Sequence, residues 1–231
     1  MRLRGTPRRL EGAVPLPTDA DEVEVDVEGL AVESIRVRPL GDPSAPERAW
    51  LRLALPPATR PGEYRGTVRA GGQEEEIALH VEPRIRLRLS PRGLILSGRA
   101  GERVAATVLA ANLGNADCAI REVSAVGLFD VEGAERAVGR TFRGTHTDGG
   151  RILERLAEEL EHGYGGLARL TVAEGAGDLA PGEARELALT FHLPDGLHPG
   201  RVYEGAWALP AVNYMVRVEV PEGRPTRKEA R

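Results

Sequence analysis

Two stretches of this chain, with equivalent tyrosines 139 residues apart at Tyr64 and Tyr203, carry nearly the same residues. Each stretch has a Leu-Pro pair, then a Pro-Gly pair, then a tyrosine with a glycine two positions after it. The members are Leu55-Pro56, Pro61-Gly62, Tyr64 and Gly66 in one stretch and Leu193-Pro194, Pro199-Gly200, Tyr203 and Gly205 in the other. A repeat of such a long period is one domain copied, rather than a short solenoid unit. The 231 residues therefore predict two similar domains in tandem.

Apolar and polar residues alternate with a period of two along most of the chain. Valines alternate with acidic residues over 23–27, and Ile, Leu and Val alternate with other residues over 76–81. This period predicts strands with one face in a core and the other in water. Gly71-Gly72 predicts a hairpin turn between two such strands. Short strands at this spacing predict an all-β fold of two antiparallel β-sandwiches.

The second module contains further motifs next to its apolar strands: Ala100-Gly101-Glu102, Asn112-Leu113-Gly114-Asn115 and Ala180-Pro181-Gly182-Glu183. With Leu193-Pro194, they resemble the Ig-like, or fibronectin-like, domains of bacterial and archaeal cell-surface and secreted proteins, including those that accompany NPCBM modules. The resemblance covers residues 85–123 and 179–220, and mainly 48–82 in the first module. It implies two tandem Ig-like sandwiches, presentation or scaffolding outside the cytoplasm, and no catalytic residues.

The repeated motif has a structural explanation. A Pro-Gly pair forces a turn at the corner between two strands. A tyrosine at the start of the next strand can bury its ring while its hydroxyl returns to the backbone of the corner. Gly66 and Gly205 would then leave room for that ring or for a neighbouring backbone. Tyr64 and Tyr203 are therefore predicted to be structural residues.

We expect Ig-like domains over residues 1–83 and 84–221 and a charged, disordered tail over 222–231. The second domain holds an insertion over about 124–180, which is too long for the central strands of a small sandwich. Leucines and one isoleucine at helical spacing predict a helix over 151–162 within this insertion.

The ends of this helix carry their own signals. Thr147 or Asp148 can cap its start, and Gly163 can end it. We expect the insertion to hold whatever distinguishes this protein from a generic spacer domain.

Composition excludes several partner classes. The net charge is -4 and no basic block or basic helix face is present, so we expect neither nucleic acid nor an anionic membrane as partner. No apolar run approaches the ~18 residues of a transmembrane segment. The basic N-terminus lacks a following apolar run. We therefore expect a protein outside the cytoplasm, in the periplasm or on the cell surface, if a signal peptide was removed, and a cytoplasmic protein otherwise.

The residues give little support to catalysis or to a cofactor. His146 and Asp148 lie two positions apart in a glycine-rich loop, but His162 is a helix length away, so no metal site is predicted. The only cysteine, Cys118, follows an apolar strand pattern and is predicted to be a core residue. Nucleophile, zinc-protease and phosphate-loop motifs are absent from the sequence. We expect no enzyme activity and no bound cofactor.

These expectations favour a non-catalytic structural or protein-interaction component, presented outside the cytoplasm or docked in a larger assembly. One alternative is a periplasmic chaperone of the pilus-assembly type, for which Arg84, Arg86 and Arg88 would supply basic residues near the joint of the two domains. Another is a carbohydrate-binding accessory module, although exposed aromatic residues would be few. A protein partner is expected, and a carbohydrate partner is left open.

The hairpin over residues 207–215 has little charge, unlike the first module. An uncharged strand at an exposed edge pairs with other chains unless something covers it. The candidate interaction surface is Trp207, Leu209, Tyr214 and Met215. Either the helix over 151–162 covers this hairpin within the chain or a partner protein does.

Overall fold

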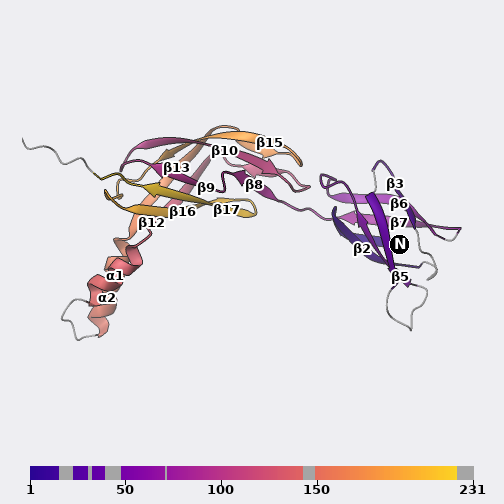
Figure 1. Cartoon of the computed structure of the whole chain (residues 1–231), viewed down its shortest axis with the longest axis horizontal. Coiled ribbons are helices and arrows are strands. Elements are labelled where there is room, and N and C mark those ends of the chain that lie inside the picture. Colours follow the sequence, from indigo (N-terminus) through magenta and orange to yellow (C-terminus); the bar gives the residue numbers. More distant parts are fainter. Residues whose placement is uncertain (16–22, 31–32, 40–47, 71, 143–148, 223–231) are drawn as a thin grey trace, which may run out of the picture. The chain divides into compact units, whose positions relative to one another are not determined.

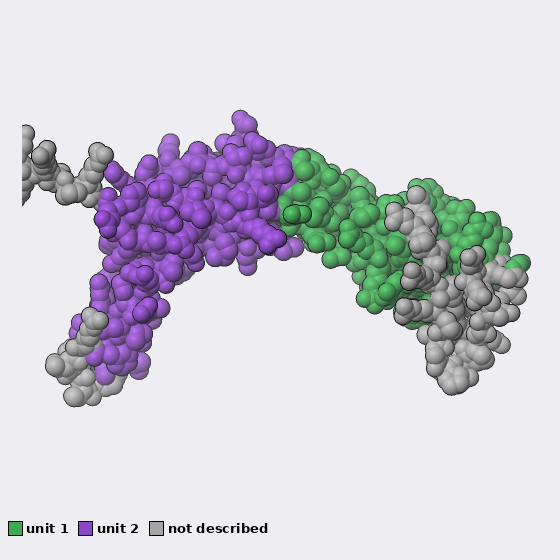
Figure 2. Space-filling view, viewed as in Figure 1, with its two compact units in different colours: residues 1–88, 111–118, 178–184 green, residues 89–110, 119–177, 185–231 purple. Residues whose placement is uncertain are grey.

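The computed structural model describes residues 1–15, 23–30, 33–39, 48–70, 72–142 and 149–222. It is an all-β fold of two sandwiches, with two helices inserted in the second (Figure 1). Two compact units are distinguished in Figure 2: unit 1 holds residues 1–88, 111–118 and 178–184, and unit 2 holds 89–110, 119–177 and 185–231. The predicted disordered tail lies almost wholly outside the described residues.

Unit 1 is built on a seven-stranded sheet in the order β3-β6-β7-β1-β2-β5-β4. The strands are β1 (Arg2–Thr6), β2 (Arg9–Pro15), β3 (Glu24–Val27), β4 (Glu33–Pro39), β5 (Arg48–Ala54), β6 (Gly62–Ala70) and β7 (Gln73–Val81). Neighbouring strands are antiparallel except β1 and β7, which are parallel. Ala70 pairs with Gln73, so β6 and β7 form the predicted hairpin, although Gly71 lies outside the described residues.

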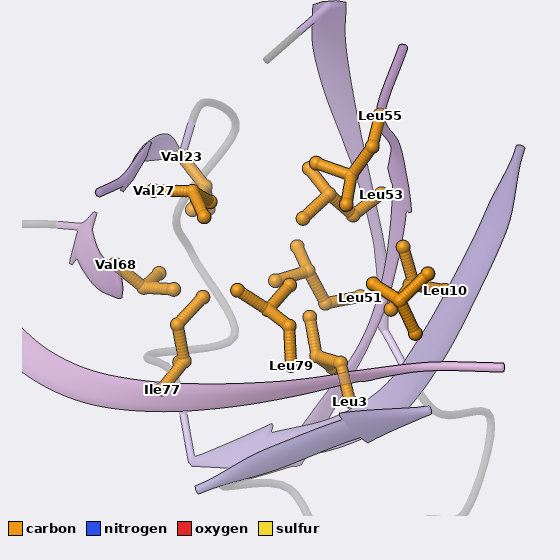
Figure 3. Packing of buried hydrophobic residues seen from close by; sticks show 11 residues of the cluster. Leu3, Leu10, Val23, Val27, Leu51, Leu53, Leu55, Val68, Ile77 and Leu79 are labelled. Atoms are coloured by element: carbon orange, nitrogen blue, oxygen red, sulfur yellow. The ribbon is translucent and has the colours of Figure 1, made fainter. Parts of the chain in front are cut away.

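The core of unit 1 joins strands from the two ends of this sheet order. Val27 and Val68 come from β3 and β6, and Leu10 and Leu51 come from β2 and β5, yet all belong to one buried cluster. Figure 3 shows these side chains pointing toward a common interior. The sheet therefore folds back on itself to form a sandwich, and each buried leucine or valine contributes roughly 1.5–3 kcal/mol to it.

Unit 2 is built on an eight-stranded sheet in the order β8-β10-β15-β13-β12-β16-β17-β9. Its strands are β8 (Leu87–Ser90), β9 (Gly93–Ser97), β10 (Arg103–Asn112), β12 (Val123–Asp130), β13 (Tyr164–Glu174), β15 (Ala184–His192), β16 (Val202–Leu209) and β17 (Val212–Glu219). β9 is parallel to β17. The end strands β8 and β9 follow each other closely in the chain, so the two ends of the sheet meet and the sandwich closes.

The repeated motif plays the same part in both copies. The Tyr64 hydroxyl donates to the carbonyl oxygen of Arg60 at 2.8 Å, and the Tyr203 hydroxyl accepts from the backbone N–H of His198 at 3.0 Å. The predicted return of each hydroxyl to its corner is confirmed. Tyr203 is fully buried, whereas Tyr64 is half-buried against the core.

The glycine after each tyrosine allows a close approach of two strands. A Cβ on Gly66 would overlap the carbonyl oxygen of Asp26 on β3, and a Cβ on Gly205 would overlap that of Gly127 on β12. Of the two explanations proposed from the sequence, the neighbouring backbone is therefore the one that applies.

The asparagine motif of the second module belongs to unit 1. Asn112 and Asn115 are both buried. The Asn115 amide donates to the carbonyl oxygens of Thr59 and Glu82, each at 3.0 Å, and accepts from the N–H of Arg84 at 2.6 Å. The Asn112 amide donates to the carbonyl oxygen of Ala116 at 2.8 Å, in the loop before β11 (Cys118–Ile120), and to that of Leu179 at 2.9 Å, in β14 (Gly177–Leu179). A buried amide must have such partners to avoid a desolvation cost.

The insertion differs from the prediction in extent and in content. Residues 124–130 and 164–179 are mostly strands of the sandwich, and only 131–163 leave it. Two helices are present instead of one: α1 (Gly133–Phe142) and α2 (Gly149–Glu161). α2 is the predicted helix, and Gly163 donates to Leu160 at its end. Its proposed caps Thr147 and Asp148 lie outside the described residues.

Candidate interaction surface

Three of the four residues predicted as an interaction surface lie in the core. Trp207 is fully buried, Tyr214 and Leu209 are buried, and only Met215 is exposed. Trp207 and Tyr214 are cross-strand partners with their rings edge to face, 6.3 Å apart. The low charge of this hairpin reflects in part these three buried side chains, so the prediction is corrected for Trp207, Leu209 and Tyr214.

The hairpin also lacks the exposed edge that the sequence argument assumed. β16 pairs with β12 on one side and β17 pairs with β9 on the other. Both strands are thus internal in the sheet order, with pairing to β12 at Tyr203 and Glu204 and to β9 over Met215–Glu219.

Exposed apolar side chains gather elsewhere in unit 2. Fifteen large hydrophobic side chains are exposed among the described residues, and nine of them lie within residues 123–167, which make up 45 of the 231 positions. The nine are Val123, Phe129, Val131, Val138, Phe142, Leu153, Leu160, Tyr164 and Leu167. Exposed apolar residues scattered singly are ordinary, whereas a concentration of them marks a binding surface.

Three of these residues form one patch on the outer face of β12 and β13, which we call the sheet patch: Phe129, Tyr164 and Leu167. Phe129 is 60% and Leu167 62% exposed. Phe129 and Tyr164 are cross-strand partners whose ring centroids are 5.1 Å apart. Gly127, opposite Leu167, has no side chain, and both the Phe129 ring and Leu167 lie within 4 Å of where its Cβ would be. The three side chains therefore share one surface.

The apolar surface continues onto the neighbouring strands. Ala206 of β16 faces Met215 of β17, and both are exposed on the outer side of the sheet. The charged pair on this part of the face is Glu204 with Arg217, whose atoms are 3.1 Å apart. Glu204 lies directly opposite Phe129. The sheet patch is thus bordered by Ala206 and Met215 and by Arg217, which pairs with both Glu204 and Glu219.

A buried carboxylate fixes the base of the two helices. The Asp130 side chain is almost wholly buried at the end of β12 and is paired with Arg136 of α1 and with Arg201, 3.2 Å away, just before β16. It also accepts from the N–H of Glu132 at 3.1 Å, next to the start of α1. One carboxylate thereby ties α1 to two strands of the sandwich.

Sites for metal or nucleophilic chemistry have little support in the described part of the chain. No three histidine, cysteine or carboxylate side chains gather there as a metal site would need. His162 is exposed, and His146 and Asp148 lie outside the described residues. Cys118 is buried, as predicted. Burial raises the pKa of its thiol, with a further rise from the Asp178 carboxylate, and this disfavours the reactive thiolate.

The described helices are too short or too polar to cross a membrane.

Comparison with known proteins gives neither a family nor a relative by sequence: no protein-family model and no curated protein matches. Solved structures with similar folds include a PapD-like domain of human CEP192, at 13% identity and TM-score 0.33, covering 60% of this chain and 87% of that one. The match with a titin I-band fragment covers 96% of this chain and 62% of the fragment, at 9% identity and TM-score 0.38. The match with domains 4 and 5 of the S-layer protein SbsC covers 70% of this chain and 66% of that one, at 14% identity and TM-score 0.29. Likeness of this degree does not bear on function.

Proposed function

We propose that this chain is a non-catalytic protein-interaction component, and that a partner protein binds over the sheet patch. The observation that carries the proposal is that Phe129, Tyr164 and Leu167 are all exposed and lie side by side on one surface. Water-exposed apolar area of this kind gains about 25 cal/mol per Å² when a partner covers it. Aromatic residues beside an aliphatic one are typical of the centre of a protein interface.

The surroundings of the patch fit a protein partner better than a sugar. Tyr164 stands beside Phe129 and Leu167, and an aliphatic residue adds nothing to the flat aromatic platform on which a sugar ring would stack. The location outside the cytoplasm and the scaffolding role implied by the resemblance stay predictions of the sequence.

Photo-cross-linking in the source cells tests the proposal. A photoreactive phenylalanine analogue in place of Phe129 or Leu167 should give a cross-linked product of defined mass. Leu109 on β10 is the matched control, since it is also a large exposed apolar residue of the same unit but lies outside 123–167. Equal products from all three positions, or none from Phe129 and Leu167, would show that the patch is not a binding surface.

A further inference from the structure

The two helices expose a second apolar surface. Phe142 of α1 is 64% and Leu153 of α2 is 68% exposed, and Val138 and Leu160 are also exposed. Gly133 at the start of α1 lies against Gly163 just after α2, so the helices run antiparallel, side by side (Figure 1). The two helices pack against each other, and these four apolar side chains stay exposed after that packing.

Helix geometry places the four residues on one side of the hairpin. Ala137 and Thr141 are the buried residues by which α1 faces α2, and Val138 and Phe142 follow each of them by one position. On α2, the half-buried Ile152 and Glu159 mark the side that faces α1, since Glu159 pairs with Arg140 of α1 at 3.1 Å. Leu153 and Leu160 each follow one of these two residues by one position. One position is a rotation of about 100°. Because the two helices run antiparallel, a step of one residue from the contact side of either helix leads to the same side of the helical hairpin. We call this side the front face, and it carries Val138, Phe142, Leu153 and Leu160.

Charges are sorted between the two sides of the hairpin. Glu135 lies three positions before Val138, and Glu154 and Glu161 each follow a front-face leucine by one position, so the three carboxylates border the front face on the sides away from the contact between the helices. None of the three forms an ion pair with another described residue. The arginines of the helices fall on the opposite side: Arg136, Arg140, Arg151 and Arg155. The front face is therefore an apolar surface with an acidic rim.

We infer that the front face binds a basic amphipathic helix of a partner protein, which completes a three-helix arrangement. The inference rests on the proposed interaction role and names the element that the partner supplies. An amphipathic helix places apolar residues at spacings of three and four, which suits the groove between two helices. Lysines or arginines on its flanks would meet the three free glutamates. An anionic membrane is disfavoured by the same rim, and a second copy of the chain would bring two acidic rims together.

Synthetic peptides test this inference with the full chain. Two peptides of about 14 residues, about 20 Å long as helices, share the same leucines and differ in flanking residues, which are lysine in one and glutamate in the other. Fluorescence anisotropy should show about tenfold tighter binding of the lysine peptide, since three rim pairs at about 0.5 kcal/mol each give this ratio. The ratio should shrink at high salt.

Three variants decide the outcome. Leu153→Glu should weaken binding of the lysine peptide at least about tenfold. Glu154→Arg with Glu161→Arg should make the glutamate peptide the better ligand. Glu174→Arg, on β13 outside the helices, makes the same charge change, is the control and should change neither peptide's binding appreciably. All these residues are exposed, so the fold should not depend on them.

Equal binding of the two peptides, no binding, or a preference that the charge reversal leaves unchanged would overturn the inference. Self-association that Leu153→Glu abolishes would overturn it too, because the occupant would then be a second copy. If the peptides fail while cross-links from Phe129 still form, the inference falls and the proposed function stands.

Discussion

Replacing Tyr203 with alanine is expected to lower the free energy of unfolding of unit 2 by about 4 kcal/mol, because a fully buried aromatic side chain leaves a cavity. The His198 N–H loses its acceptor at the same time. Thermal unfolding should show a fall of roughly 10 °C in the transition of this unit.

Two further variants separate packing from hydrogen bonding. Tyr203→Phe keeps the ring and loses only the hydroxyl, so it should cost about 1 kcal/mol. Tyr64→Ala should lower the free energy of unfolding of unit 1 by about half as much as Tyr203→Ala lowers that of unit 2, since Tyr64 is only half-buried in the equivalent position. Equal losses for Tyr64→Ala and Tyr203→Ala would contradict the difference in burial on which this account depends.

Asp130→Ala is expected to cost about 3 kcal/mol, because it leaves Arg136 and Arg201 without the carboxylate between them. The loss should be concentrated at the base of the helices. Hydrogen exchange should therefore speed up in α1 and α2 more than in β15 or β17, and thermal unfolding gives the total.

Glu204→Ala is the control for this variant. Glu204 also pairs with an arginine of unit 2, but both side chains are about two-fifths exposed. Its removal should change the free energy of unfolding by less than about 0.5 kcal/mol. If Asp130→Ala were equally mild, Asp130 would not be the anchor of the helices.

The sequence predicted those features that depend on local chemistry. Pro-Gly corners, the tyrosine hydroxyl and the following glycine each have one physical role, and both copies of the motif confirm it. The apolar positions at helical spacing likewise located α2. These features can be predicted from neighbouring residues in the sequence, without knowing which distant strands pair with each other.

The first helix was missed because its residues are weak helix formers. Gly139, Thr141 and Phe142 favour other conformations, and α1 depends on Asp130, on Arg136 and on packing against α2. That support comes from tertiary structure, which local propensity does not reveal.

The surface was mispredicted because β16 is apolar on both faces. Trp207 and Leu209 alternate with Ala206 and Ala208, so a period of two cannot show which face is buried. β12 has the same property, with Val126 and Leu128 inside and Phe129 outside. An apolar residue on both faces of one strand was the signal that could have located the sheet patch.

The central claim is that residues 131–162 and the adjoining sheet patch serve recognition and that the sandwich folds without these helices. The backbone N–H of Asp130 donates to the carbonyl oxygen of Gly163, so the two strands can be joined there by a two-residue Asn-Gly turn in place of 131–162.

Native size measurement of the complexes formed in source cells, with the full chain and with this deletion, tests the claim most directly. We expect the full chain in a heavier complex and the deletion variant as a folded monomer with a cooperative thermal transition. A deletion variant that keeps the heavier complex even when it also carries Phe129→Ser and Leu167→Ser, or one that no longer folds, would contradict the claim.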